Sequence, residues 1–238
     1  LTILSPVRDW DLGCRADEIA WAAAHNVPVK ATAEAPYSID DNLWGRAIEC
    51  GVLEDPWCEA PADIYTMTVD PVCAPDAPTY VEIDFEAGVP CALNGEKMPF
   101  LDIIYALNDI AGGNGFGRID MVENRLVGVK SRECYEAPAA LTLIKAHKAL
   151  EDLCLERSVL HHKLGIEQAW ADQVYNGLWF SPLKEAFDAF IAHTQQCVTG
   201  TVKLKLYKGS CTVVGRKSAF SLYDFGLATY DADDAFDH

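Results

Sequence analysis

The sequence predicts an α+β fold, with a mixed or antiparallel sheet and packed helices, preceded by a small β-α piece. Residues 80–93 and 202–214 alternate apolar and polar side chains, which is typical of half-buried strands. Residues 100–110, 138–153 and 182–191 instead repeat apolar side chains with the helical period. Because strands and helices do not alternate regularly along the chain, a parallel sheet of βαβ units is not predicted.

The N-terminal piece is predicted to be a strand, a helix and a second extended run. TIL at residues 2–4 is apolar, residues 15–25 place Ile19 and Ala23 on one helical face, and VPVK follows at 27–30. This β-α-β piece is too small to bury a core of its own, and a loop rich in Ala, Pro and Glu places a boundary near residue 35. Since an apolar opening strand needs neighbours on both sides, we expect the chain to begin within a longer protein.

A β-meander is predicted after residue 79. Its two strands present alternate apolar side chains, namely Val81, Ile83, Phe85, Val89, Cys91 and Leu93. The sequence EAG turns the chain between these strands, and Asn94-Gly95 marks a second tight turn. One face of this meander is expected to be solvated. A hairpin with a KGS turn, in which Val202, Leu204 and Leu206 face inward, closes the pattern.

Three helices are predicted from caps and apolar stripes. The first follows Pro99, and the second has Pro138 in its first turn. His147 shares an apolar face of the second helix, which favours a hydrogen-bonded core histidine over a metal ligand. Ser181 caps the third helix ahead of Pro182. The stripe expected to be buried there consists of Leu183, Phe187, Phe190 and Ile191.

The glycine-rich run AGGNGFG at residues 111–117 has two interpretations. A phosphate-binding loop follows a strand and opens a helix, whereas this run follows a helix and leads into a β-like segment. We therefore predict a helix end and a turn, with Gly112 just past the helix, where a left-handed conformation costs glycine little.

The composition argues against several classes of partner. A formal charge of −17 is unsuited to a nucleic-acid backbone, and no apolar run is long enough to span a bilayer. Nine scattered cysteines without a C-x-x-C pair favour reduced thiols over a disulfide framework or a zinc site. His161 and His162 are adjacent and make a poor chelate, so no metal site is predicted.

Polar residues are dense in two stretches. One holds Ser38 and the acids of YSIDDNLW, and the other, VENRLVGVKSRECYE, holds Glu123, Lys130, Arg132 and Tyr135. This mixture suits a zwitterion, because a carboxylate can hold an ammonium group while hydroxyls or a guanidinium hold a carboxylate. A solvated loop with ordinary surface ion pairs is the alternative.

Five long motifs resemble the argininosuccinate synthase family in its bacterial form, over essentially the whole chain. They occur in the family's order at residues 37–57, 89–98, 117–153, 174–191 and 198–238. The resemblance implies an ATP-dependent ligase of arginine biosynthesis and the urea cycle. Citrulline is adenylated on its ureido oxygen with loss of pyrophosphate, and the amine of aspartate then displaces AMP to give argininosuccinate. It also implies a cytoplasmic homotetramer.

The resemblance further implies three parts. Residues 1–34 are the C-terminal remnant of an α/β nucleotide-binding domain, residues 35–225 the synthetase and oligomerisation domain, and residues 226–238 the start of an oligomerisation tail. The family's Ser-Gly-Gly-x-Asp pyrophosphate loop and its aspartate-binding stretch have no counterpart. ATP and Mg are thus expected as co-substrates of the intact enzyme, not as tightly bound cofactors of this chain, which is predicted to be inactive alone. The alternative is a stand-alone binding or assembly module without catalysis.

Three positions match the family's citrulline site. By resemblance, Ser38 contacts citrulline through its hydroxyl, Glu123 meets its ammonium group, and Tyr135 is a phenolic partner. Tyr135 could instead be a core residue. No residue is assigned a catalytic role.

One position departs from the family, and two matching positions have structural alternatives. Ala47 stands where many relatives have a second citrulline-contacting serine, in a helix predicted around NLW. Ser38 could merely cap a helix that begins at IDDNLW. Glu123 could pair with Arg125 or Lys130.

Overall fold

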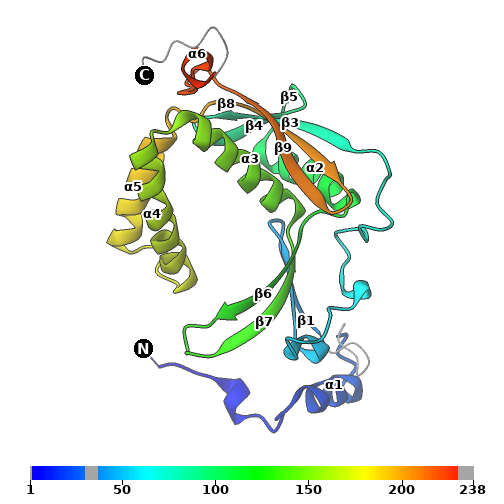
Figure 1. The fold of residues 1–238 in the computed structure, drawn as a ribbon. Helices are drawn as coiled ribbons and strands as arrows, with labels where there is room; N and C mark the ends of the chain where they lie inside the picture. Colours follow the sequence, from blue (N-terminus) through cyan, green and yellow to red (C-terminus); the bar gives the residue numbers. More distant parts are fainter. Residues whose placement is uncertain (1, 30–36, 230–238) are drawn as a thin grey trace. The chain divides into compact units, whose positions relative to one another are not determined.

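The computed structural model describes residues 2–29 and 37–229, which form an α+β fold with two antiparallel sheets (Figure 1). The strand orders are β1-β2-β7-β6 and β5-β4-β3-β8-β9. The strands are β1 (Ser38–Asp41), β2 (Arg46–Glu49), β3 (Thr79–Glu86), β4 (Val89–Leu93), β5 (Glu96–Lys97), β6 (Arg118–Asn124), β7 (Lys130–Glu136), β8 (Gly200–Tyr207) and β9 (Ser210–Lys217). The α-helices are α1 (Arg15–Ala24), α2 (Phe100–Gly113), α3 (Pro138–Cys154), α4 (Arg157–Tyr175), α5 (Pro182–Gln195) and α6 (Phe225–Ala228). The predicted α+β class is confirmed.

The chain divides into two compact units. The smaller unit comprises Leu1–Asn42, Arg46–Ile64 and Asp120–Tyr135, and the larger comprises Leu43–Gly45, Tyr65–Ile119 and Glu136–His238. Most of the four-stranded sheet belongs to the smaller unit, and the five-stranded sheet to the larger.

The core of the larger unit lies between the five-stranded sheet and helices α2 and α3. The predicted alternation in β3 and β8 is confirmed, since Val81 lies opposite Leu204, Ile83 lies opposite Val202, and all four are buried. Strand β4 deviates from the predicted alternation. A bulge shifts its register between Asp84 and Phe85 of β3, so that Ala92 and Leu93 are both buried while Val89 is 56% exposed.

A buried polar network supports the predicted role of His147 in α3. Its Nε2 lies 2.8 Å from Oε1 of Gln195, whose Nε2 donates to Glu151 Oε1 at 2.7 Å. Lys163 of α4 pairs with the same carboxylate at 2.9 Å. Glu151 and Lys163 are both buried, so removing either one would leave the charge of the other buried without its ion-pair partner. His147 is therefore a hydrogen-bonded side chain of this network.

The N-terminal β-α-β piece is not confirmed. Helix α1 is present, but residues 2–4 and 27–29 form no strand, and Lys30 lies outside the described residues. Ile3 and Leu4 are 93% and 81% exposed. The physical reason is the lack of a partner, because a strand needs a neighbouring backbone for its hydrogen bonds, and neither sheet in the described residues includes this segment.

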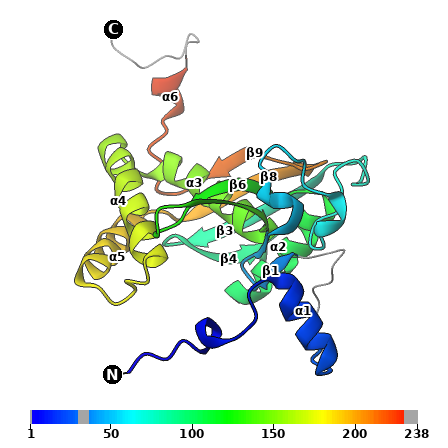
Figure 2. The same ribbon diagram turned by 90° about the horizontal axis from the view of Figure 1, so that it is seen from below.

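Helices α4 and α5 lie side by side in both views (Figure 2). The predicted cap of α5 is confirmed, since the Ser181 hydroxyl accepts a hydrogen bond from the backbone nitrogen of Lys184. The predicted buried stripe is wrong. Leu183 is 50% exposed, and Phe187, Phe190 and Ile191 are only half-buried. Polar Lys184 is buried instead, with its ammonium 3.7 Å from the Trp179 ring centre. Among residues 2–29 and 37–229, no helix combines the length and apolarity needed to cross a membrane.

The glycine run ends α2 and precedes β6, so the predicted order of elements is confirmed. Gly112, however, lies inside the helix, not past its end. A Cβ at this position would lie 2.2 Å from the Met67 carbonyl oxygen, and the Gly112 carbonyl accepts from the Val69 nitrogen at 3.0 Å. The left-handed positions are Gly115 and Gly117, with φ of +74° and +128°. Gly112 is thus required for close backbone contact and not for a turn.

Glu136, the last residue of β7, holds segment 66–68 through its fully buried carboxylate. The backbone nitrogens of Thr66, Met67 and Thr68 donate to it at 2.9 Å, and the Thr68 hydroxyl donates at 2.8 Å. Arg118 then donates from Nε to that hydroxyl oxygen at 2.8 Å. We call Glu136 together with its three hydrogen-bond donors, Thr66, Met67 and Thr68, the Glu136 cluster. Its carboxylate satisfies backbone groups that no strand or helix pairs.

Candidate functional site

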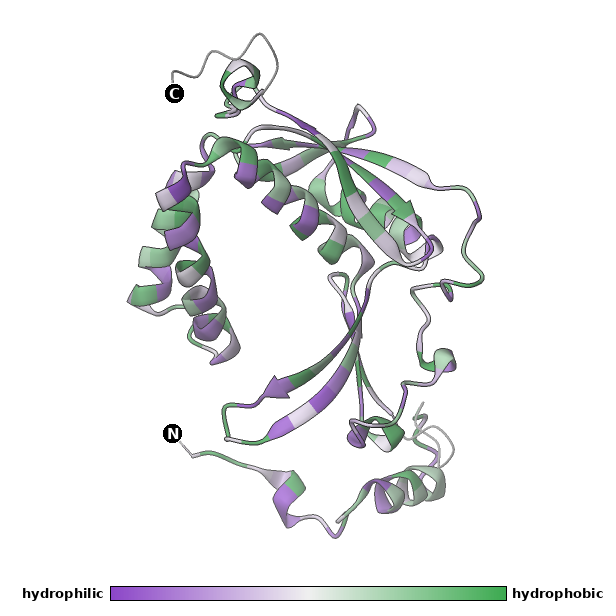
Figure 3. Ribbon diagram, in the orientation of Figure 1, coloured by the Kyte–Doolittle hydropathy of each residue, from purple (hydrophilic) through white to green (hydrophobic). Residues whose placement is uncertain are grey.

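The four-stranded sheet presents two chemically different faces. Side chains alternate between the faces along β7, so that Ser131, Glu133 and Tyr135 point one way and Arg132 and Cys134 the other. Figure 3 shows hydrophilic residues along β6 and β7.

The face that carries Arg132 is a structural one. Its Nη1 donates to the backbone carbonyls of Asp55 and Cys58 at 2.9 and 2.8 Å, and its guanidinium pairs with Asp120 at 2.6 Å. The hydrogen bond to Asp120 raises the pKa of Arg132, and the same bond lowers the pKa of Asp120. The sequence predicts Arg132 as a residue that could bind a zwitterion, because its surroundings are polar. In the structure it instead anchors the loop that carries Asp55 and Cys58. The ammonium group of Lys130 donates to the Asn124 side chain.

The opposite face gathers acidic groups around one guanidinium. Nη2 of Arg125 contacts Glu133 at 2.5 Å and Glu49 at 2.7 Å, and Nε donates to the Ser131 hydroxyl at 2.7 Å. Glu123 approaches Nη2 to 3.6 Å. The predicted alternative of a Glu123–Arg125 ion pair is therefore present, but it is the longest of the three carboxylate contacts. Three carboxylates around one guanidinium leave a formal charge of −2.

Tyr135 joins this cluster through Glu133. The half-buried phenol donates a short hydrogen bond to Glu133 Oε2. Burial raises the pKa of Tyr135, and Glu133 raises it further, so the phenol keeps its proton at neutral pH. Burial and the neighbouring Glu123 carboxyl group raise the pKa of Glu133. Tyr135 is thus a hydrogen-bonded residue of the sheet face and not an apolar core residue.

Ser38 and Ala47 lie on strands, so the predicted helix around NLW is wrong. Ser38 of β1 is the cross-strand partner of Glu49, and Ala47 of β2 is the partner of Asp40. The backbone of this segment forms an antiparallel ladder with β2, and Ser38 consequently caps no helix. Directly opposite residues share a face, which places Ser38 on the face of Glu49. Ala47 shares that face because it lies two residues before Glu49 in β2.

We call this surface the polar face. Its members are Ser38, Ala47, Glu49, Glu123, Arg125, Ser131, Glu133 and Tyr135. The three predicted site residues, Ser38, Glu123 and Tyr135, therefore share one face of one sheet. Sequence reasoning missed Glu49 and Glu133. The period of two in β7 could have indicated Glu133, which lies two residues before Tyr135, whereas nothing local to Glu49 indicates its partner 76 residues away.

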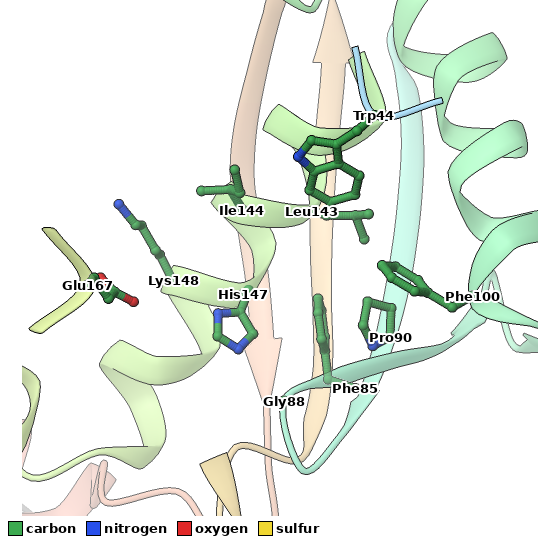
Figure 4. A pocket seen from close by; sticks show the side chains of 10 residues that line it. All are labelled: Trp44, Phe85, Gly88, Pro90, Phe100, Leu143, Ile144, His147, Lys148 and Glu167. Atoms are coloured by element: carbon green, nitrogen blue, oxygen red, sulfur yellow. The ribbon is translucent and has the colours of Figure 1, made fainter. Parts of the chain in front are cut away.

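A cavity of about 270 Å³ in the larger unit has a different character (Figure 4). Its lining residues are Trp44, Phe85, Gly88, Pro90, Phe100, Leu143, Ile144, His147, Lys148 and Glu167. Figure 4 shows Lys148 and Glu167 at one end, away from Trp44 and Phe100. This mainly apolar lining is unsuited to a small zwitterion, which needs charged and hydrogen-bonding partners at both of its ends. No group of His, Cys, Asp and Glu in the part of the chain that the structure describes could hold a metal ion.

Comparison with known proteins gives one consistent result. Residues 37–238 match the family model described as the arginosuccinate synthase C-terminal domain. The chain is 59% identical over 237 residues to argininosuccinate synthase of Streptococcus gordonii, covering all of this chain and 59% of that protein. It is 57% identical over 238 residues to the enzymes of the same name from Oceanobacillus iheyensis and Symbiobacterium thermophilum, covering 57% and 59% of them. The chain thus spans less than three-fifths of the length of these relatives.

Proposed function

Because this chain belongs to the argininosuccinate synthase family, we propose that it supplies the citrulline-binding part of an ATP-dependent ligase. In this proposal citrulline and aspartate condense to argininosuccinate, with release of AMP and pyrophosphate, in the cytoplasm. The chain contributes binding and subunit assembly, and the remaining length that its relatives carry contributes the nucleotide site.

The observation that supports this proposal is the common face of Ser38, Glu123 and Tyr135. Citrulline carries an ammonium and a carboxylate at one end and a neutral ureido group at the other. A formal charge of −2 on the polar face favours the ammonium group over the carboxylate. Glu123 is the best placed of the three carboxylates to meet it, because Glu49 and Glu133 each bond to Arg125 at 2.7 Å or less while Glu123 stays 3.6 Å away.

The proposed chemistry needs this chain to position citrulline and not to transfer a proton. The ureido oxygen attacks the α-phosphorus of ATP, and the bond to pyrophosphate breaks. The aspartate nitrogen then attacks the ureido carbon, and the C–O bond to AMP breaks as that nitrogen loses a proton. Binding the amino-acid end at a fixed sheet face holds the ureido end in one place, which is the entropic contribution that such a site makes.

We propose that the part its relatives carry beyond this chain, and not this chain, supplies the sites for ATP and Mg. The glycine run follows a helix, the reverse of the order in a phosphate-binding loop, and the described residues hold no metal-binding group. The isolated chain is expected to release no pyrophosphate from ATP in the presence of citrulline. A citrulline-dependent release by the purified 238-residue chain would contradict this division of labour.

Replacing Glu123 with glutamine tests the binding site in the complete polypeptide, meaning this chain together with the segment that its relatives carry. Glu123→Gln keeps the shape but removes the charge from a hydrogen bond to the ammonium group, which is worth about 1.5–3 kcal/mol. The KM for citrulline should therefore rise roughly ten- to a hundredfold, while the constants for ATP and aspartate stay nearly unchanged.

The matched control is Asp120→Asn, on the other face of the same strand. It removes the carboxylate that pairs with Arg132 and is expected to lower thermal stability without a selective citrulline defect. If Glu123 serves only its ion pair with Arg125, then Glu123→Gln will behave like this control. An unchanged citrulline KM would remove Glu123 from the site.

Assembly into a homotetramer is the second part of the proposal. Its support is the apolar surface of α5 and the segment before it, where Phe180 and Leu183 are 89% and 50% exposed. Closed symmetric oligomers usually bury such faces against a second copy. The C-terminal tail proposed to take part continues beyond Thr229, outside the described residues.

A further inference from the structure

Glu133 accepts hydrogen bonds from two donors on the polar face and has the Glu123 carboxyl group as a neighbour. Its Oε1 accepts from Arg125 Nη2 at 2.5 Å, and its Oε2 accepts from the Tyr135 hydroxyl. Only 8% of the Glu133 side chain is exposed. A phenol carries a single hydrogen, and here that hydrogen is directed at Glu133. The Tyr135 oxygen therefore keeps only its acceptor capacity for any other group.

We infer that Glu133 is a positioning residue, which fixes the Tyr135 hydroxyl as a hydrogen-bond acceptor toward the ammonium group of a bound amino acid. This inference rests on the proposed function, because it assigns the amino end of citrulline to Tyr135 as well as to Glu123. Glu133 itself need not touch the ligand, since both of its oxygens have partners on the sheet.

Arg125, which holds Glu133 in position, is itself held by other contacts. Arg125 is held by the Ser131 hydroxyl at 2.7 Å and by Glu49 at 2.7 Å, in addition to Glu133. A planar guanidinium with several partners has little freedom to turn. Glu133 is therefore oriented from one side by Arg125, and it orients Tyr135 on the other.

This arrangement discriminates between the two ends of a zwitterion. An ammonium group brings hydrogen-bond donors, and Glu123 and Tyr135 both offer acceptors to it. A carboxylate brings only acceptors, and it would meet an occupied phenol and a surplus of negative charge. Without Glu133 the phenol could rotate and donate, and the preference of this position for an amino group would weaken.

The first test is a double-mutant cycle in the complete polypeptide, with Glu133→Gln, Tyr135→Phe and the double variant. Tyr135→Phe removes the hydroxyl oxygen that accepts from the ammonium group, and Glu133→Gln lets that hydroxyl turn away. We therefore expect each single change to raise the citrulline KM roughly three- to tenfold, with kcat nearly unchanged. Because Glu133 acts mainly through Tyr135, adding Glu133→Gln to Tyr135→Phe should raise the KM by a clearly smaller factor than Glu133→Gln does alone.

Glu49→Gln is the matched control for the cycle. It removes a carboxylate from the same Arg125 nitrogen, but Glu49 makes no contact with the Tyr135 hydroxyl that the structure describes. Whatever its effect on citrulline, that effect should persist in the Tyr135→Phe background. If Glu133→Gln also keeps its full effect there, Glu133 acts through charge alone and the inference is wrong.

The second test follows the ionisation of Tyr135 by its ultraviolet absorbance and needs no catalysis. Burial raises the pKa of Tyr135 and Glu133 raises it further, so Glu133→Gln should make this one tyrosine titrate at a lower pH than in the unmodified protein, while burial keeps its pKa above the ordinary value. Tyr135→Phe identifies that signal by removing it, and Glu49→Gln should leave it unchanged. The urea midpoint of each variant shows whether the fold is intact.

The two tests separate failure of the inference from failure of the proposed function. If the unmodified polypeptide shows no citrulline-dependent product, the proposed function fails and the tyrosine titration alone decides whether Glu133 fixes the phenol. If citrulline is used but Glu133→Gln shifts neither the titration nor the KM, the positioning role is overturned and the proposed function stands.

Discussion

Gly112→Ala is expected to destabilise the folded protein by about 3 kcal/mol or more. The new methyl carbon would lie 2.2 Å from the carbonyl oxygen of Met67, a backbone atom that cannot move without shifting segment 66–68. Overpacking of this kind typically costs about 1–3 kcal/mol, and a backbone obstacle belongs at the upper end. Urea unfolding followed by circular dichroism measures the difference.

Gly113→Ala is the matched control. Gly113 is the next residue of the same helix, and nothing lies within 4 Å of the position its Cβ would take. Alanine has the higher helix propensity, so this change should be neutral or stabilising by up to about 1 kcal/mol. Equal stability of the two variants would show that segment 66–68 moves freely away from α2.

Glu136→Gln is the second change with a large expected effect. The carboxylate receives four hydrogen bonds in the Glu136 cluster, and its side chain is fully buried. An amide has one oxygen and one NH2 group, so at least the donor that faces Oε2, the Thr66 nitrogen, would meet another donor. The other bonds would also lose their charge-assisted strength. We expect a loss of about 3 kcal/mol, since a buried unsatisfied donor alone costs about 1–3 kcal/mol.

Glu86→Gln controls for the chemical change itself. Glu86 ends β3 in the same unit but is exposed, so its amide variant should lie within about 0.5 kcal/mol of the parent. The comparison uses the same urea unfolding measurement. If Glu136→Gln is as mild as Glu86→Gln, the four hydrogen bonds contribute little net stability.

Local periodicity predicted the strands and helices that carry their own pattern. Strands β3 and β8 alternate clearly because one face of each is buried and the other solvated. The start of α3 follows from Pro138 in its first turn, and the cap of α5 follows from Ser181. Strands β1 and β2 were not predicted. Each is four residues long, and its register depends on a partner strand, which no local pattern reveals.

The apolar stripe of α5, which is not fully buried, shows the limit of arguments from amphipathicity. The sequence of Leu183, Phe187 and Ile191 indicates an apolar face, but it does not say what covers that face. In the described residues Leu183 is exposed and Phe187 and Ile191 are only half-buried, while Lys184 is buried beside Trp179. A cationic side chain with a long apolar stem can do this, because an aromatic ring accepts its charge.

The candidate site was predictable only in part for a similar reason. Ser38, Glu123 and Tyr135 could be named from motifs, but the connection between them could not. Arg125 joins residues from three strands, and Glu133 was missed because a glutamate in a polar strand looks like an ordinary solvent-facing residue. Burial, which changes its chemistry, comes from the sheet and not from the neighbouring sequence.

The Glu136 cluster also determines which positions of this chain are free to vary. Three of its four donors are backbone nitrogens, so the carboxylate does not sense the identity of the side chains at positions 66 and 67. Nineteen of the twenty amino acids supply the same N–H group, and only proline does not. The side chain that holds this segment is thus Glu136 alone, and the residues at positions 66 and 67 can change without loss of their contacts, whereas Thr68 also contributes its hydroxyl.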